Sequence, residues 1–468
     1  MAFSTAKKFP VCHPEVASAT EGSYRFISKE GSGFFAALRM TLIICSLFFS
    51  YTACAQTAAT CVPIAKQFLD LMEHEKYHDA YQLLDTSVTK LIPEAKNTEG
   101  WKQIHAKMGA LKKQTKVRFE ENKPYASVFL TCEFERAALD LKVVFGVRSR
   151  IVGYFLVPTA NYTPPNYADT NSIIERPVEV KTGSYTLSGI LTMPKKGDHF
   201  PVVVLVHGSG PNDKDETINL NKPFKDLAFG LASKGIASLR YDKRTFVYGS
   251  KSATDPKKIT MKEEVIDDAL SALHLAQTFK ETDPKKIFLL GHSLGAIAAP
   301  RIAKETPFVA GIIFMAGSAR SFEDVIADQM SYILPMQLPK KQADSLLAIL
   351  AAQVARIKRG DFNDSTATLP LGLSAVYWKD IKNYDQVAAA KYLAMPMLFL
   401  QGEKDYQVTM KDFNLWKQAL AAKKNAQFIF YPGLVHLFMQ GEGKPSDYQK
   451  SGHVAEKVIT DIASWIKR

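Results

Sequence analysis

Cysteine is scarce in this chain, with five residues among 468. So few cysteines cannot build the dense disulfide framework of a small secreted domain, and the chain is long enough for ordinary hydrophobic cores. Only Cys61 and Cys132 follow the N-terminal segment, and they either pair with each other or remain buried thiols. Neither lies near the candidate catalytic residues identified below, so the sequence gives no support for a cysteine nucleophile.

Long apolar runs are also lacking, since the stretch 40–49 is too short for a transmembrane helix of about 20 residues. It leads to a small-residue cleavage pattern before Gln56, as in a signal peptide. Cys54 offers the alternative of a lipoprotein anchor, although Tyr51 stands where an aliphatic residue is usual. Residues 1–55 are therefore predicted to be a targeting segment, with an extended n-region or an early start codon, and the mature chain to be periplasmic or extracellular.

The basic excess of the chain, +12 at neutral pH, has no local concentration. Its lysines are scattered, and no basic stripe alternates with aromatic residues as on a nucleic-acid-binding face. The acidic string at 213–216 lacks the spacing of a calcium loop. We therefore predict no nucleic-acid partner and no metal. We interpret 213–216 as a solvated loop, with a salt bridge to Arg240 or Arg244 as one arrangement.

The chain does contain a Gly-x-Ser-x-Gly turn at 291–295, between an apolar run at 287–290 and a small-residue helical pattern at 296–299. A strand that turns sharply into a helix at such a pentapeptide exposes the serine hydroxyl at the top of a sheet. The glycines permit the tight turn. The pattern predicts Ser293 as a nucleophile, with His292 as the variable position. The alternative of an ordinary turn serine is weakened by the flanking strand and helix.

Two later strand ends carry an acid and a histidine, in the order Ser, Asp, His that this kind of sheet uses. Asp405 and His436 each follow a short apolar run. The carboxyl ends of parallel strands meet at one edge of the sheet. We expect His436 to take the proton of Ser293, and Asp405 to orient and charge-stabilise His436. Glu403 is a competing acid, and Asp405 is favoured because it lies deeper in its loop.

A fourth element lies upstream, where the aliphatic run 202–206 ends in a His-Gly-Ser-Gly loop at 207–210. Such a run is typical of a strand buried on both faces. The backbone N–H of Ser209 is predicted to join that of Leu294 in an oxyanion hole for a tetrahedral intermediate. His207 is expected to pack and hydrogen-bond behind this loop.

These motifs give residues 176–468, roughly three-fifths of the chain, a resemblance to bacterial α/β-hydrolase esterases. The nearest group shares features with dienelactone hydrolases and prolyl-oligopeptidase-like domains. The resemblance is carried by the strings at 207–216, 239–244, 291–295, 402–405 and 434–436. It implies carboxylic-ester hydrolysis without a cofactor, by an acyl-enzyme route. It is specific for the fold and much less specific for the substrate.

Alternating strand and helix patterns favour the same α/β class, an α/β-hydrolase fold with a mostly parallel sheet and helices on both faces. An antiparallel hairpin is predicted around 182–184, followed by strands at 202–206, 236–241, 287–290, 312–315, 397–400 and 427–431. Helices are predicted at 223–234, 260–279, 411–422 and 447–467. Between 318 and 392, apolar helical patterns replace strands. We interpret this interval as a helical cap whose apolar underside would favour a hydrophobic acyl group, although most of its apolar residues would simply pack it onto the sheet.

Residues 57–157 are predicted to form a small N-terminal α+β domain. Two amphipathic helices, one with Phe68 and one running from Trp101 to Leu111, precede strand-like stretches at 116–120, 126–133, 139–145 and 151–157. A proline-rich linker at 158–177 leads to the catalytic domain, 178–468. The module resembles small domains of unknown role found before some bacterial hydrolases. It binds a partner, binds substrate or pairs two chains into a homodimer, and its sequence does not choose among these.

The function predicted from the sequence is that of an exported serine esterase acting on a small-molecule ester with a short-to-medium acyl or acetyl group. One alternative is a serine peptidase or amidase of prolyl-oligopeptidase-like type, which must also protonate an amine leaving group. Its sequence shows no propeller to restrict peptide entry. A second alternative, a binding protein on a hydrolase scaffold, is opposed by the complete set of Ser293, Asp405 and His436.

Overall fold

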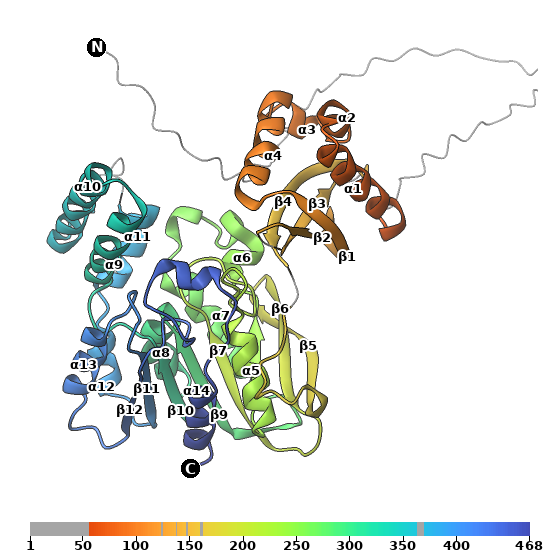
Figure 1. Cartoon of the computed structure of the whole chain (residues 1–468). Coiled ribbons are helices and arrows are strands. Elements are labelled where there is room, and N and C mark those ends of the chain that lie inside the picture. Colours follow the sequence, from red (N-terminus) through yellow and green to blue (C-terminus); the bar gives the residue numbers. More distant parts are fainter. Residues whose placement is uncertain (1–55, 123–124, 137, 147, 160–161, 363–368) are drawn as a thin grey trace, which may run out of the picture. The chain divides into compact units, whose positions relative to one another are not determined.

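The computed structural model describes residues 56–122, 125–136, 138–146, 148–159, 162–362 and 369–468. The predicted targeting segment, with both of its alternative processing sites, lies outside these residues. Figure 1 shows an N-terminal region with a small sheet and a larger region with a long twisted sheet. No helix in the described part of the chain is long and apolar enough to cross a membrane.

The larger region is built on an eight-stranded sheet with the order β12-β11-β10-β9-β7-β8-β6-β5. Its strands are β5 (Ile173–Thr182), β6 (Tyr185–Pro194), β7 (Phe200–Val206), β8 (Ala237–Tyr241), β9 (Thr282–His292), β10 (Gly311–Met315), β11 (Met397–Gly402) and β12 (Ala426–Tyr431). Strands β7 to β12 are mutually parallel, whereas β6 runs antiparallel to both β5 and β8. The predicted mostly parallel sheet is confirmed.

Both faces of this sheet are covered, as the aliphatic central strands require (Figure 1). Along β7, Val202 and Val204 pack into one core with helices α7 (Asp267–Ala276) and α8 (Leu294–Glu305). Val203 faces the other core, with helices α5 (Pro223–Ser233) and α14 (Glu456–Ile466). The α/β-hydrolase fold with helices on both faces is therefore confirmed.

Among the element boundaries that differ from the sequence prediction, two in the larger region have a clear physical reason. Strand β5 begins at Ile173, inside the expected linker, because it pairs along its length with β6. Pro177 is tolerated there because β5 is the edge strand. Helix α14 begins at Glu456, so its predicted start at 447 is wrong. Residues before it are held in a loop by the Asp226 carboxylate, which accepts hydrogen bonds from His453 and from the backbone of Val454.

The interval between β10 and β11 is helical within its described residues. It contains α9 (Phe322–Gln337), α10 (Lys340–Arg359), α11 (Ala375–Lys382) and α12 (Gln386–Lys391). Arg301 on α8 binds the carboxylate of Asp380 on α11 at 3.0 Å, which fastens this interval to the sheet's helical layer. Of its apolar side chains, Val354 and Ile357 are buried, whereas Leu346 is exposed. The apolar pattern thus serves partly to pack the helices.

The N-terminal region is the predicted small α+β domain. Its helices are α1 (Ala58–Glu73), α2 (Tyr77–Gln82), α3 (Thr86–Thr89) and α4 (Glu94–Met108). They precede an antiparallel meander of β1 (Leu111–Asn122), β2 (Tyr125–Phe134), β3 (Ala138–Phe145) and β4 (Ile151–Pro158). Phe68 and Trp101 lie in its core, and Leu111 belongs to β1 rather than to the preceding helix. Cys61 and Cys132 are buried free thiols, and burial raises the pKa of Cys132 to about 12.

Candidate active site

Ser293 sits in a strained turn between β9 and α8. Its φ of 53° and ψ of −113° are rare for a residue with a side chain, and such strain is concentrated at functional sites. A β carbon on Gly291 would lie 2.3 Å from the carbonyl oxygen of Gly295. One on Gly295 would lie 2.2 Å from that of Val206. Glycine is therefore required on both sides of the serine, which accounts for the pentapeptide.

The loop after β7 lies directly beside this turn. A β carbon on Gly208 would lie 3.2 Å from the β carbon of Ser293. The N–H of Ser293 donates to the carbonyl of Met315, which ties the turn to the end of β10. Ser293 itself is only half-buried. The structure thus brings the predicted nucleophile and the predicted oxyanion loop together at the carboxyl edge of the sheet.

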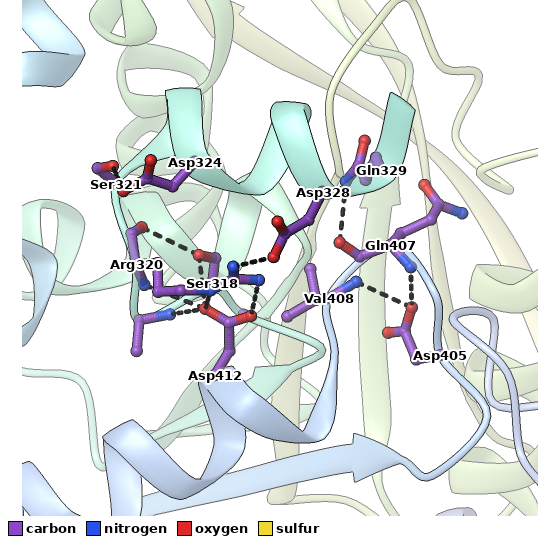
Figure 2. Close-up of polar contacts among 12 residues, drawn as sticks. Ser318, Arg320, Ser321, Asp324, Asp328, Gln329, Asp405, Gln407, Val408 and Asp412 are labelled. Carbon is purple, nitrogen blue, oxygen red and sulfur yellow. Dashed lines mark hydrogen bonds and ion pairs between the residues drawn. The ribbon is translucent and has the colours of Figure 1, made fainter. Parts of the chain in front are cut away.

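His436 and Asp405 are hydrogen-bonded to each other in the buried loops after β12 and β11. His436 Nδ1 and Asp405 Oδ2 are 2.7 Å apart. The second carboxylate oxygen accepts from the backbone N–H groups of Gln407 and Val408, at 2.8 and 3.0 Å, as Figure 2 shows. Oδ2 also accepts from the side-chain amide of Gln401 at 3.1 Å. With four donors around it, the carboxylate fixes the proton of His436 on Nδ1.

The competing acid, Glu403, has different partners. Its carboxylate accepts from the backbone N–H of Gly433 at 3.2 Å and lies 3.8 Å from the ammonium of Lys404. Its side chain is largely exposed, whereas that of Asp405 is fully buried. The structure pairs Asp405, not Glu403, with His436.

The loop that carries Asp405 is fastened to its neighbours by polar contacts (Figure 2). Gln329 on α9 donates to the carbonyl of Gln407 at 3.0 Å. Asp412, in the first turn of α13 (Met410–Ala419), is completely buried. Its carboxylate accepts from the Ser318 hydroxyl and from the backbone and guanidinium of Arg320. These contacts tie the chain after β10 to the chain after β11, and no local sequence pattern predicts them.

In the loop after β7, successive amides have different roles. The N–H of Gly208 is occupied, since it donates to the carboxylate of Glu216 at 2.6 Å. Ser209 is the next residue and is exposed. Leu294 is the first residue of α8, where a backbone N–H has no partner within the helix. Within the described residues, neither the N–H of Ser209 nor that of Leu294 donates a hydrogen bond. Both are therefore available to a bound oxyanion.

His207 packs behind this loop, as its position suggested. It is buried between Phe224 and Tyr241, with ring centroids 5.1 and 5.4 Å away. Its Nε2 donates to the carbonyl of Asp213 at 3.0 Å. Burial lowers the pKa of His207 to about 4, outweighing the attraction of Glu216. The imidazole is consequently neutral in the folded protein at physiological pH.

This shift predicts a pH-dependent stability. Because the folded pKa of His207 lies below the unfolded value near 6.5, its contribution is complete above pH 6.5 and is lost as the pH falls toward 4. The shift amounts to about 3 kcal/mol of unfolding free energy. In urea unfolding at pH 7 and pH 4, the wild type should lose about that much more stability than His207→Gln. The control is His274→Gln, which makes the same change at an exposed histidine. Parallel losses in wild type and His207→Gln would contradict the assignment.

The acidic string at 213–216 is not a solvated loop, because Asp215 and Glu216 are buried. Asp215 binds Arg240 Nε at 2.9 Å and Lys222 Nζ at 3.0 Å. Burial raises the pKa of Asp215, but these two cations outweigh it and lower the pKa to about 2. Of the two predicted ion-pair partners, Arg240 is correct, whereas Arg244 binds Asp268 instead.

The Gly-x-Ser-x-Gly pattern assigns His292 only to a variable position. In the structure it contacts both Glu216, in the loop after β7, and His436, in the loop after β12. Its Nδ1 lies 2.9 Å from a carboxylate oxygen of buried Glu216, and its Nε2 lies 3.1 Å from the carbonyl oxygen of His436. The Nε2 atom donates to this carbonyl, whereas the Nδ1 atom and the carboxylate are a close ionic contact without hydrogen-bond alignment. Burial alone would lower the pKa of His292, but Glu216 outweighs it and raises the pKa. Glu216 thereby joins the Gly208 amide to the His436 loop.

Within the described residues, no three His, Cys, Asp or Glu side chains are placed to hold a metal ion together.

Comparison with known proteins gives two family matches. Residues 197–443 match the family described as "Serine aminopeptidase, S33", and residues 65–153 match "Protein of unknown function (DUF3887)". Esterase EstD of Thermotoga maritima is 34% identical over 403 residues, which span 85% of this chain and 93% of EstD.

Two solved structures are more distantly similar. Est1E from Butyrivibrio proteoclasticus, with ferulic acid bound, has 15% identity and a TM-score of 0.42, and the match covers 62% of this chain and 98% of that one. An esterase from Pyrococcus furiosus has 16% identity and a TM-score of 0.42, with coverage of 68% and 98%.

Proposed function

Since the chain belongs to the serine aminopeptidase S33 family of α/β-hydrolases, we propose that it is an exported serine hydrolase of short-to-medium acyl or acetyl esters. The identity with EstD along most of both chains supports carboxylic-ester hydrolysis as the reaction. The observation that carries the serine mechanism is the 2.7 Å contact of His436 with Asp405 at the edge where Ser293 is held in its strained turn.

In the acylation step, Ser293 Oγ attacks the carbonyl carbon of the ester while its proton passes to His436 Nε2. The carbonyl oxygen becomes an oxyanion, which accepts hydrogen bonds from the N–H groups of Ser209 and Leu294. Asp405 stabilises the imidazolium that forms, since its carboxylate already holds the Nδ1 proton. The intermediate collapses when the ester C–O bond breaks and the alcohol leaves with the proton of His436.

In the deacylation step, a water molecule takes the place of the alcohol. His436 Nε2 accepts a proton from this water as its oxygen attacks the acyl carbon. The same two N–H groups hold the second oxyanion. The bond to Ser293 Oγ then breaks, the proton returns to Ser293, and the carboxylic acid leaves. The cycle is balanced without a metal or an organic cofactor.

Amide or peptide hydrolysis is the second candidate, and the description of the matched family favours it. The same residues would serve, with His436 protonating an amine rather than an alcohol. Amines are poorer leaving groups than alkoxides or phenolates, so the identity of the leaving group separates the two reactions.

The test combines covalent labelling with a substrate panel. A fluorophosphonate probe should label Ser293 in the folded protein, and mass spectrometry of the labelled peptide identifies the site. Nitrophenyl esters of graded acyl length should be cleaved much faster than aminoacyl-nitroanilides. Absence of label on folded protein would overturn serine catalysis, and faster cleavage of the anilides would replace the esterase by the peptidase.

Export is proposed from the sequence of residues 1–55, which precede the described part of the chain. N-terminal sequencing of the protein recovered from the producing cell tests it. A mature chain that starts at Gln56 supports signal-peptide cleavage, and a lipid-modified Cys54 supports the lipoprotein route. A cytoplasmic protein that retains residue 1 would contradict both.

A further inference from the structure

The peptide unit between Gly208 and Ser209 is held from behind by a buried cation. The ammonium of Lys243, which is only 2% exposed, donates to the carbonyl oxygen of Gly208 at 2.8 Å. The same ammonium binds the carboxylate of Glu264 at 2.6 Å. The other oxygen of that carboxylate accepts from the hydroxyl of Tyr377, on α11, at 2.7 Å. The cation is thus held between a carbonyl oxygen and a carboxylate that is itself fixed by Tyr377.

The geometry of a peptide unit gives this contact a consequence. The C=O of Gly208 and the N–H of Ser209 belong to the same planar trans unit, so they point in opposite directions. A donor that fixes the carbonyl therefore fixes the direction of the N–H. A positive charge at the carbonyl end also draws electron density from the amide and strengthens its N–H as a donor. The Ser209 N–H is the one that the proposed mechanism assigns to the oxyanion.

The peptide unit on the other side of Gly208 is held as well. The Gly208 N–H, which belongs to this preceding unit, donates to the carboxylate of Glu216. Asn212 adds a weaker contact, at 3.3 Å, to the Gly208 carbonyl that Lys243 binds. The loop is therefore fixed by a carboxylate at one peptide and by an ammonium at the next. If the loop were exposed and had only a structural role, water could hydrogen-bond to both the Gly208 N–H and the Gly208 carbonyl. Placing a lysine side chain in the interior is costly, and it requires a partnered ammonium such as this one.

We infer that Lys243 is a positioning residue for ester hydrolysis, acting through the Gly208–Ser209 peptide to aim and strengthen the Ser209 N–H toward the oxyanion. The inference rests on the proposed serine mechanism. Lys243 lies in a cluster of buried charged residues at the end of β8, for which structural ion pairs are the ordinary interpretation. Its neighbour Arg244 fits that interpretation, because within the described residues its guanidinium hydrogen-bonds to Asp268 and not to the oxyanion loop.

The test removes the cation without leaving its partner charged. In Lys243→Met/Glu264→Gln, the glutamine can still accept from Tyr377 while the ammonium is lost. The matched control is Arg244→Met/Asp268→Asn, which removes a neighbouring buried ion pair of the same kind. Each is assayed for kcat and KM on a nitrophenyl ester, and for inhibition by a trifluoromethyl ketone, whose adduct with Ser293 places an oxyanion in the hole. Circular dichroism melts report the folded fraction.

Loss of one oxyanion donor costs about 10²- to 10³-fold in kcat, so a residue acting through that donor should cost about 10- to 100-fold. We expect kcat to fall by this factor with little change in KM, and the Ki of the ketone to rise by the same factor. The control pair should keep both constants per folded molecule. A second variant, Lys243→Gln/Glu264→Gln, keeps a hydrogen-bond donor in a less disruptive side chain and should show a smaller loss in both constants.

Equal kcat and Ki in a folded Lys243 variant and the Arg244 control would overturn the inference. A fall in kcat with unchanged ketone affinity would also overturn it, because the oxyanion would then not be the group affected. The proposed function has its own test in Ser293→Ala. An active Ser293→Ala would remove the serine mechanism, whereas an inactive one beside a fully active Lys243 variant would remove only the role of Lys243.

Discussion

Ser293→Ala should lower kcat for ester hydrolysis by about 10⁴- to 10⁶-fold while leaving the fold intact. Alanine keeps the β carbon, so the strained φ of 53° and the packing against Gly208 are unchanged. Only the hydroxyl that would carry the acyl group is removed. Since the covalent route depends on that one oxygen, the loss falls on kcat rather than on substrate binding.

The measurement is steady-state hydrolysis of the best nitrophenyl ester, with thermal unfolding followed alongside. Ser345→Ala, on an exposed turn of α10, removes a serine hydroxyl far along the chain and should match the wild type in both assays. Residual activity in Ser293→Ala that disappears on further purification would be contamination. Wild-type turnover that copurifies with the variant would show that another group is the nucleophile.

The fold could be predicted because aliphatic strand runs alternate with helical patterns along the sequence. The run Val202–Val206 is aliphatic at every position, and in the structure its alternate side chains enter two different cores. Such a strand can exist only in the middle of a sheet covered on both sides. The need for glycine at 291 and 295 could be predicted from the pentapeptide as well. The structure gives the reason, because no side chain fits beside the backbone of Val206 or across the turn itself.

The supporting shell of the site could not be predicted in the same way. Glu216 lies in a string of charges that resembles a solvated loop, yet it is buried against Gly208 and His292. Lys243 lies close to Arg240 and Arg244, all three of which are buried, and nothing in their spacing tells which one reaches the Gly208 carbonyl. Composition and periodicity report which elements form, whereas these contacts depend on how loops from distant strands meet at one edge. Lys243 and Glu264 are 21 residues apart in the chain, and such a separation leaves no local pattern.

Asp405→Asn should lower kcat by about 10⁴-fold, because both orientations of the new amide conflict with its surroundings. With its oxygen toward Gln407 and Val408, the amide NH₂ faces the Nδ1 of His436 and the side-chain NH₂ of Gln401. His436 would then have to carry its proton on Nε2, where it cannot accept one from Ser293. With the amide reversed, its NH₂ faces two backbone N–H groups instead.

Glu403→Gln is the matched control, since it makes the same chemical change two residues earlier on a side chain that binds the Gly433 amide. It should retain wild-type kcat, because a glutamine oxygen can accept that hydrogen bond equally well. The comparison therefore separates the loss of a carboxylate in this loop from the loss of the one that holds the imidazole. If Glu403→Gln were inactive and Asp405→Asn active, the loop would have to rearrange before catalysis, so that the acid seen beside His436 is not the one that acts.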